Sequence, residues 1–157
     1  MEITASAVAE LRKRTGAGMM DCKKALVEAQ GNEDKAIEIL RIKGIAKATS
    51  KSDRKTSDGL VCIEVSDCGK KGVLVEVNCE TDFVARTDDF KTICNGIVKH
   101  LFETKHGVIV EFVGENILNE KFQGTSDKSV EEYLKEGVAK LGENMRITHY
   151  AAFETSD

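Results

Sequence analysis

Several groups of residues in this sequence are of types that perform chemistry in other proteins, but none has the spacing of a known catalytic motif. Residues 16–18 (Gly-Ala-Gly) begin like a dinucleotide-binding loop, yet Asp21 stands where the third glycine is needed and no strand is expected before it. Residues 69–71 (Gly-Lys-Lys) lack the Ser or Thr of a phosphate-binding loop. No G-x-S-x-G or H-E-x-x-H motif occurs. The sequence therefore predicts a binding protein and not an enzyme.

Cysteine and histidine are the remaining candidates for nucleophilic chemistry or metal binding. The five cysteines are odd in number and no pair has C-x-x-C spacing, which argues against a disulfide framework and a zinc site. The histidines are scattered, so we expect neither a metal nor a cofactor. A thiol enzyme with Cys79 as nucleophile and His149 as base is an alternative. We favour reduced cysteines that pack in the interior. They are Cys22, Cys62, Cys68, Cys79 and Cys94.

The elements that must position any site begin with three short helices in residues 1–44. Glycines in the turn at residues 15–18 end the first helix, and Gly31 ends the second. Asn32 is a good N-cap for the third helix, which we expect to end at Gly44. The sequence thus predicts a minimal three-helix module.

Basic residues concentrate in the first third of the chain. Residues 1–57 hold 12 Lys and Arg against 8 Asp and Glu, whereas residues 58–157 hold 11 against 19. The basic part peaks between Arg41 and Lys55. We interpret residues 45–58 as a solvated basic linker whose first residues are compatible with a helix, with contact to an acidic surface or to RNA as the alternative. No aromatic residue lies among these charges, so no direct nucleic-acid binding by stacking is expected.

A change to two-residue periodicity after residue 58 predicts an α+β domain over residues 59–157. It should hold about three antiparallel strands with helices on one face, and its other face is expected to be partly apolar, which favours self-association. The segment from Val108 to Val113 is ambiguous between a strand and a buried turn. We expect strands at about residues 60–65, 73–77 and 145–153, a short helix at 116–121, and amphipathic helices over 90–101 and 129–141.

The location of the protein is predicted from what its sequence lacks. No run approaches the roughly 18 apolar residues of a membrane span, and the N-terminus shows no secretory signal. We expect a protein of the bacterial cytoplasm without membrane contact, and a processed organellar form is the alternative.

Two segments are long and specific. Residues 11–26 read LRKRTGAGMMDCKKAL, and residues 76–86 read EVNCETDFVAR. A third stretch, residues 140–146, reads KLGENMR. In this order they resemble the signature sequences of the elongation factor Ts family, the nucleotide-exchange factors of elongation factor Tu. The resemblance covers nearly all of the chain.

This resemblance implies an architecture and a set of partners. Residues 1–44 would be similar to ubiquitin-associated domains, and residues 59–157 would be the core and dimerisation domain. The chain looks like the short form of the family, with one core lobe, which implies a homodimer. The partner would be elongation factor Tu, both bound to GDP and free of nucleotide. An adaptor that uses the helical module to bind another protein, without exchange activity, is the alternative function.

The resemblance also implies two contact regions on elongation factor Tu. Met19 and Met20, beside a glycine turn, would contact its nucleotide domain together with Arg12 and Lys23. Methionine suits such an apolar contact because it is flexible and polarizable. The alternative is that both methionines pack inside the three-helix module.

The second contact region implied by the resemblance is a strand-to-helix corner. Thr81 can cap a helix that begins with Asp82 and Phe83. In the family the phenyl ring inserts between helices of Tu's nucleotide domain and disturbs its magnesium and phosphate site. Leu141 and Gly142 match family residues that contact the same partner. The alternative for Phe83 is a place in the core.

Overall fold

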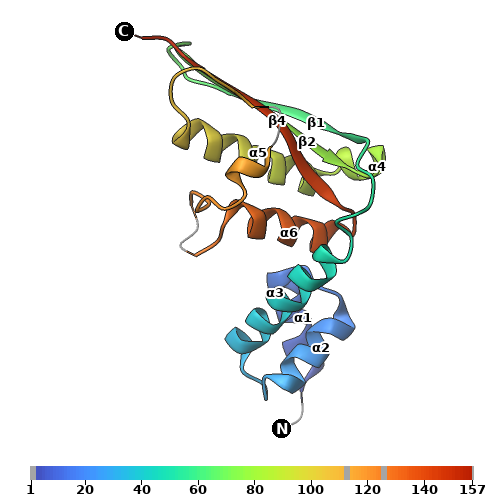
Figure 1. The fold of residues 1–157 in the computed structure, drawn as a ribbon. Coiled ribbons are helices and arrows are strands. Elements are labelled where there is room, and N and C mark those ends of the chain that lie inside the picture. Colours follow the sequence, from blue (N-terminus) through green and yellow to red (C-terminus); the bar gives the residue numbers. More distant parts are fainter. Residues whose placement is uncertain (1–2, 112–113, 125–126, 157) are drawn as a thin grey trace.

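The computed structural model describes residues 3–111, 114–124 and 127–156. Helices cover one face of a four-stranded antiparallel sheet, and three N-terminal helices project from the far side of that helical layer (Figure 1). The fold is therefore α+β, as the sequence predicts. Its elements are α1 (Ala5–Thr15), α2 (Met19–Glu28), α3 (Glu33–Thr49), β1 (Asp58–Val65), β2 (Lys71–Cys79), α4 (Asp82–Ala85), α5 (Asp88–Thr104), β3 (Ile109–Glu111), the 3-10 helix η1 (Gly114–Ile117), α6 (Val130–Leu141) and β4 (Met145–Glu154).

Local capping signals explain where most helices begin and end. The side chain of Asn32 accepts a hydrogen bond from the Lys35 amide at the start of α3. Ser129 and Glu132 form the predicted capping box of α6. Gly142 ends α6 in the left-handed conformation, with φ of 79°. These predicted helix ends are confirmed. They could be predicted because each depends on groups within four residues along the chain.

The end of α3 at Gly44 was predicted wrongly, since α3 continues to Thr49. Gly44 lies against α6, and a Cβ atom placed on it would come within 3.2 Å of the Cβ of Ala139. Its small size thus permits a close helix contact, which outweighs its weak helix propensity. Ala48, near the end of α3, is buried in the core of the α+β part. The first residues of the expected linker are therefore part of a docked helix.

The sheet has the strand order β1-β2-β4-β3, with every neighbouring pair antiparallel. The predicted hairpin of β1 and β2 is confirmed. The fourth strand, β3, comes from the segment that the sequence left ambiguous, because three residues are too few to show a period. The short helix expected at residues 116–121 is instead a 3-10 helix that begins and ends earlier.

One face of the sheet packs against α5 and forms the main core with α6. The largest fully buried side chains there include Phe90, Ile97, Leu101, Val75, Val77 and Val130. A separate, smaller core lies among α1, α2 and α3, around Leu11, Cys22, Ala25 and Leu26. Within the part of the chain that the structure describes, no helix has both the length and the apolar character of a membrane span.

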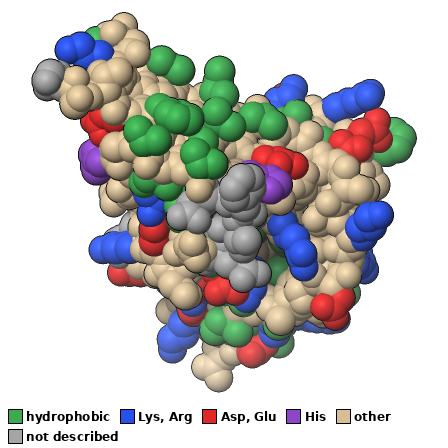
Figure 2. Space-filling view, turned by 45° about the horizontal axis from the view of Figure 1, so that its top comes forward, with side chains coloured by type: hydrophobic (Ala, Val, Ile, Leu, Met, Phe, Trp, Pro, Cys, Tyr) green, Lys and Arg blue, Asp and Glu red, His purple; other side chains and the backbone are tan. Residues whose placement is uncertain are grey.

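The other face of the sheet is covered by no element of the described chain and is largely apolar. Six of its side chains are 40–66% exposed, and we call them the outer patch. They are Val61, Ile63, Val65, Leu74, Val110 and Phe153. Figure 2 shows hydrophobic side chains gathered in the upper half of the molecule, on the sheet side. Soluble proteins rarely expose such a continuous group, so this face is suited to an interaction.

Candidate functional site

Phe83 is the most exposed large hydrophobic side chain among the described residues, with 81% of its surface accessible. It lies on α4, the short helix that follows β2, and the hydroxyl of Thr81 caps this helix by accepting a hydrogen bond from the Val84 amide. The alternative that Phe83 packs in the core is therefore wrong. Burying a Phe side chain contributes about 1.5–3 kcal/mol, so its exposure is not explained by the stability of the fold.

A charged pair lies beside Phe83 on the same helix. The carboxylate of Asp82 is 3.1 Å from the guanidinium of Arg86, one helical turn along. Both groups are substantially exposed, so the pair contributes at most about 1 kcal/mol to folding. The corner therefore presents an aromatic ring next to an acidic and a basic group.

The corner that carries Phe83 is fixed by a residue far away in sequence. One carboxylate oxygen of Glu143 accepts the backbone amides of Glu80 and Thr81, at 3.0 and 2.9 Å. Its other oxygen accepts the Thr81 hydroxyl at 2.5 Å. Glu143 directly follows Leu141 and Gly142, which are half-buried and exposed. The structure thus brings the predicted contact residues 81–83 close to the predicted contact residues 141–142.

Asn144 extends this polar network to the segment that follows α3. Its backbone amide donates to the Glu80 carboxylate at 2.8 Å. Its side-chain amide donates to the carbonyl oxygens of Ser52 and Arg54, at 3.1 and 2.8 Å. We did not identify Glu143 and Asn144 as functional candidates from the sequence. Their sequence signals are that they lie in the family-like stretch of residues 140–146 and that they separate a helix-ending glycine from an apolar strand.

The predicted contact residues of the helical module lie on its surface. Met19 and Met20, at the start of α2, are 46% and 63% exposed. Packing of both methionines inside the module is therefore contradicted. Arg12 on α1 and Lys23 on α2 are also exposed. Val27, two turns after Met20, adds a third exposed apolar side chain to α2.

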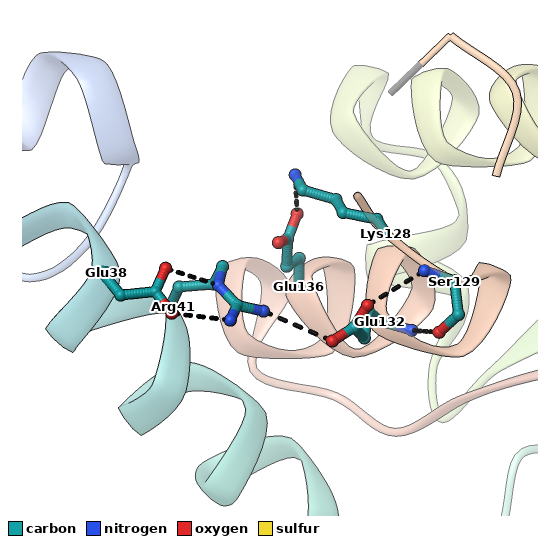
Figure 3. Close-up of polar contacts among 6 residues, drawn as sticks. All are labelled: Glu38, Arg41, Lys128, Ser129, Glu132 and Glu136. Atoms are coloured by element: carbon teal, nitrogen blue, oxygen red, sulfur yellow. Dashed lines mark hydrogen bonds and ion pairs between the residues drawn. The ribbon is translucent and has the colours of Figure 1, made fainter. Parts of the chain in front are cut away.

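The helical module and the core meet where α3 crosses α6. The guanidinium of Arg41 donates to Glu38 on its own helix at 2.7 and 2.9 Å, and it lies 3.4 Å from Glu132 of α6 (Figure 3). Glu132 also accepts the backbone amide of Ser129. Together with the Gly44 contact, this junction connects the two predicted contact regions.

The geometry contradicts a thiol enzyme built on Cys79. Its side chain is buried on the inner face of the sheet, where it donates to the carbonyl oxygen of Thr81 at 3.2 Å. His149 lies on the outer face, 2.6 Å from the Glu76 carboxylate. Burial, assisted by the negative charge of Glu143, raises the pKa of the Cys79 thiol to about 11. At neutral pH this thiol is protonated and is a poor nucleophile.

The described cysteines and acidic groups show no grouping that is typical of a metal site. Among the residues with described positions, no three His, Cys, Asp or Glu side chains are grouped so that they could hold an ion. Cys62 and Cys94 interact between β1 and α5, and burial raises the pKa of both thiols.

We expect Cys68 to be the cysteine that reacts fastest with iodoacetamide in the native protein. It is exposed in the turn between β1 and β2, and hydrogen bonds from the Ser66 hydroxyl and the Lys70 amide lower the pKa of its thiol. Mass spectrometry of briefly alkylated protein, with Cys68→Ser as control, measures this order. Faster modification of Cys79 than of Cys68 would contradict it.

Comparison with known proteins identifies the family. A family model described as elongation factor TS matches residues 80–157. The chain is 45% identical over 157 residues to the elongation factor Ts of Aquifex aeolicus, a match that covers 100% of this chain and 54% of that protein. It is 38% identical to the elongation factor Ts of Fervidobacterium nodosum over 197 aligned residues, which cover 100% of both chains. The chain belongs to the elongation factor Ts family.

The members of the elongation factor Ts family that match this chain differ in length. The chain spans about half the length of the Aquifex aeolicus protein and of the Halothermothrix orenii protein, to which it is 44% identical over 156 residues. The full-length match to the Fervidobacterium nodosum protein is consistent with the short form of the family. The family model covers the corner with Thr81, Asp82 and Phe83, and residues 141–142 as well. The methionines of α2 lie within the match to the Aquifex aeolicus and Fervidobacterium nodosum proteins, since each of these matches covers 100% of this chain.

Proposed function

We propose that this protein is a guanine-nucleotide exchange factor that binds elongation factor Tu·GDP and promotes GDP release during translation elongation. The observation that carries the proposal is the exposed ring of Phe83 on a corner that Glu143 holds in place. Membership of the elongation factor Ts family supports it. The protein acts as a binding partner in the bacterial cytoplasm, without a catalytic residue or a cofactor of its own.

The proposed mechanism is mechanical and electrostatic. Asp82 and Phe83 act as a wedge that enters between helices of Tu's nucleotide domain and displaces groups that hold the magnesium ion and the phosphates. The wedge need not touch the nucleotide. By linkage, GDP weakens the binding of this protein to Tu by the same factor by which this protein weakens the binding of GDP. GTP then replaces GDP by mass action.

The second contact is made by the helical module. Met19 and Met20 supply an exposed apolar surface, and Arg12 and Lys23 provide charge beside it. Thr81, Leu141 and Gly142 line the contact around the wedge. Because α3 docks on α6 through Gly44 and Arg41, the two contacts act as one rigid surface. Such preorganisation reduces the entropy lost on binding.

The protein is further proposed to act as a homodimer that is formed through the outer patch. The patch is apolar and lies on a face that no described element covers. Two copies that pack these faces against one another would remove the exposed surface in both, as a two-fold axis requires. The dimer would also supply a second core lobe.

The test of the function is the release of a fluorescent GDP analogue from elongation factor Tu of the same source, with an excess of unlabelled GDP. Substoichiometric amounts of this protein should accelerate release by about tenfold or more, since coupling between ligands typically reaches 5–150-fold. A folded protein that leaves the release rate unchanged at excess concentration would contradict the proposal and favour an adaptor role.

A further inference from the structure

The carboxylate of Glu143 accepts its hydrogen bonds from a segment that is distant in the sequence. Glu143 lies between α6 and β4, whereas its carboxylate accepts three hydrogen bonds from the corner between β2 and α4. The donors are the amides of Glu80 and Thr81 and the hydroxyl of Thr81. Hydrogen bonds to an ionised acceptor are shorter and stronger than those between neutral groups. Glu143 is therefore a strong and specific brace for this corner.

The brace is reciprocal. The carboxylate of Glu80, on the corner, accepts the backbone amide of Asn144 at 2.8 Å, next to Glu143. The guanidinium of Arg54 lies 3.6 Å from the same carboxylate oxygen. Each of the two segments thus supplies a carboxylate to the backbone of the other. Movement of the corner would break bonds on both sides.

The corner needs such support because its own structure is small. Helix α4 has four residues, and helices far shorter than 12–15 residues are not stable by themselves. Phe83 is exposed and makes no core contact that would orient the helix. On the underside, Ala85 is buried and the Thr81 hydroxyl caps the helix. The direction of the ring is therefore set by the backbone of residues 80–82 together with the packing of Val84 and Ala85 on the core.

We propose that Glu143 is a positioning residue, which holds the backbone at Glu80 and Thr81 so that Phe83 projects in the direction needed to displace groups in the partner. This inference rests on the proposed exchange function. If the corner moved when Phe83 touched the partner, the ring would bind without displacing groups of the partner. If the corner is held rigid, the binding energy of the ring can displace those groups. Glu143 therefore acts on the rate of GDP release through Phe83, without contact to the nucleotide.

The test compares Glu143→Gln with Glu136→Gln in the GDP-release assay. Glutamine keeps the size of Glu143 but loses its charge, so the hydrogen bonds from the Glu80 and Thr81 amides become neutral and weaker. The maximal release rate should fall about tenfold, while the concentration at half-maximal rate changes much less because the α2 contact is intact. Glu136→Gln, on the helix α6 that precedes Glu143 and paired with Lys128 (Figure 3), should keep the rate of the unaltered protein.

A second comparison separates positioning from a general loss of structure. In the Phe83→Ala background, Glu143→Gln should change the release rate by less than about twofold, because a residue that acts through the ring has no effect without it. A further tenfold loss in that background would overturn the proposal. Hydrogen exchange should show faster exchange of the Glu80 and Thr81 amides in Glu143→Gln, with the amides of α5 unchanged.

The outcomes distinguish this inference from the proposed function. If the unaltered protein fails to accelerate GDP release, the exchange function itself is wrong. If it accelerates release and Glu143→Gln does so equally well, although its Glu80 and Thr81 amides are deprotected, only the positioning role is overturned. Glu80→Gln weakens the hydrogen bond from the Asn144 amide to residue 80 and should also lower the maximal rate of GDP release. It replaces Glu143→Gln in the test if that variant does not fold, and an unchanged rate in Glu80→Gln would then overturn the proposal.

Discussion

Replacement of Phe83 by Ala should lower the maximal rate of GDP release from elongation factor Tu by about 30-fold or more, the effect of losing an interface hot spot of about 2 kcal/mol. The thermal stability of the protein should stay close to that of the unaltered protein, because the ring is 81% exposed and supports no core. Binding to nucleotide-free Tu should persist through the α2 contact. Stopped-flow measurement of fluorescent GDP release over a range of protein concentrations gives the maximal rate.

The control for this variant is Ile42→Ala, which removes an exposed apolar side chain from α3. It should leave the release rate within about twofold of the unaltered protein, as expected for a surface position outside both contact regions. If Phe83→Ala exchanged GDP at the full rate, the wedge would have to lie elsewhere. The brace around Glu143 would then have no functional consequence either.

Replacement of Ile63 by Glu should convert the proposed homodimer into a monomer. Ile63 lies in the outer patch and is 66% exposed in the single chain, so the folded monomer tolerates a charge there. In a face-to-face dimer the same charge would be buried without a partner, which costs several kcal/mol. The dimer should therefore weaken by at least about 100-fold, or about 2.7 kcal/mol. Light scattering or sedimentation at micromolar concentration measures the change in mass.

A matched control is Val27→Glu, the same kind of change at an exposed position on α2, away from the sheet. It should leave the mass of the dimer unchanged, whatever its effect on the contact with Tu. A monomeric mass for the unaltered protein would contradict the dimer outright. A dimeric Ile63→Glu would place the interface on a surface other than the outer patch.

The elements of this fold could be predicted wherever the deciding groups lie close together in sequence. Thr81 and Ser129 cap their helices through amides three residues ahead, and Gly142 ends α6 by its own left-handed conformation. The hairpin of β1 and β2 follows from alternation and a turn rich in polar residues and glycine. The contact residues were also named from the sequence, through the family resemblance of the segments that contain them. Their roles stay predictions.

Tertiary contacts decided the features that the sequence left open or that we predicted wrongly. Gly44 ends no helix because Ala139, 95 positions later, lies against it. The alternation in β1 defines two faces, but only the packing of α5 on the opposite face leaves Ile63 exposed. The division of the chain at residues 44 and 58 is not tested by these contacts and stays a prediction.

The candidate site shows the same division. The sequence by itself predicted that Thr81 caps a helix that begins with Asp82 and Phe83 after a strand, because a cap acts within one turn. It left open whether the ring was buried or exposed, and it gave no sign that Glu143 braces the corner across 62 positions. Only the folded chain brings the α6–β4 junction beside the β2–α4 corner. A hydrogen bond depends on where atoms lie in space, and sequence periodicity reports only the neighbours along one element.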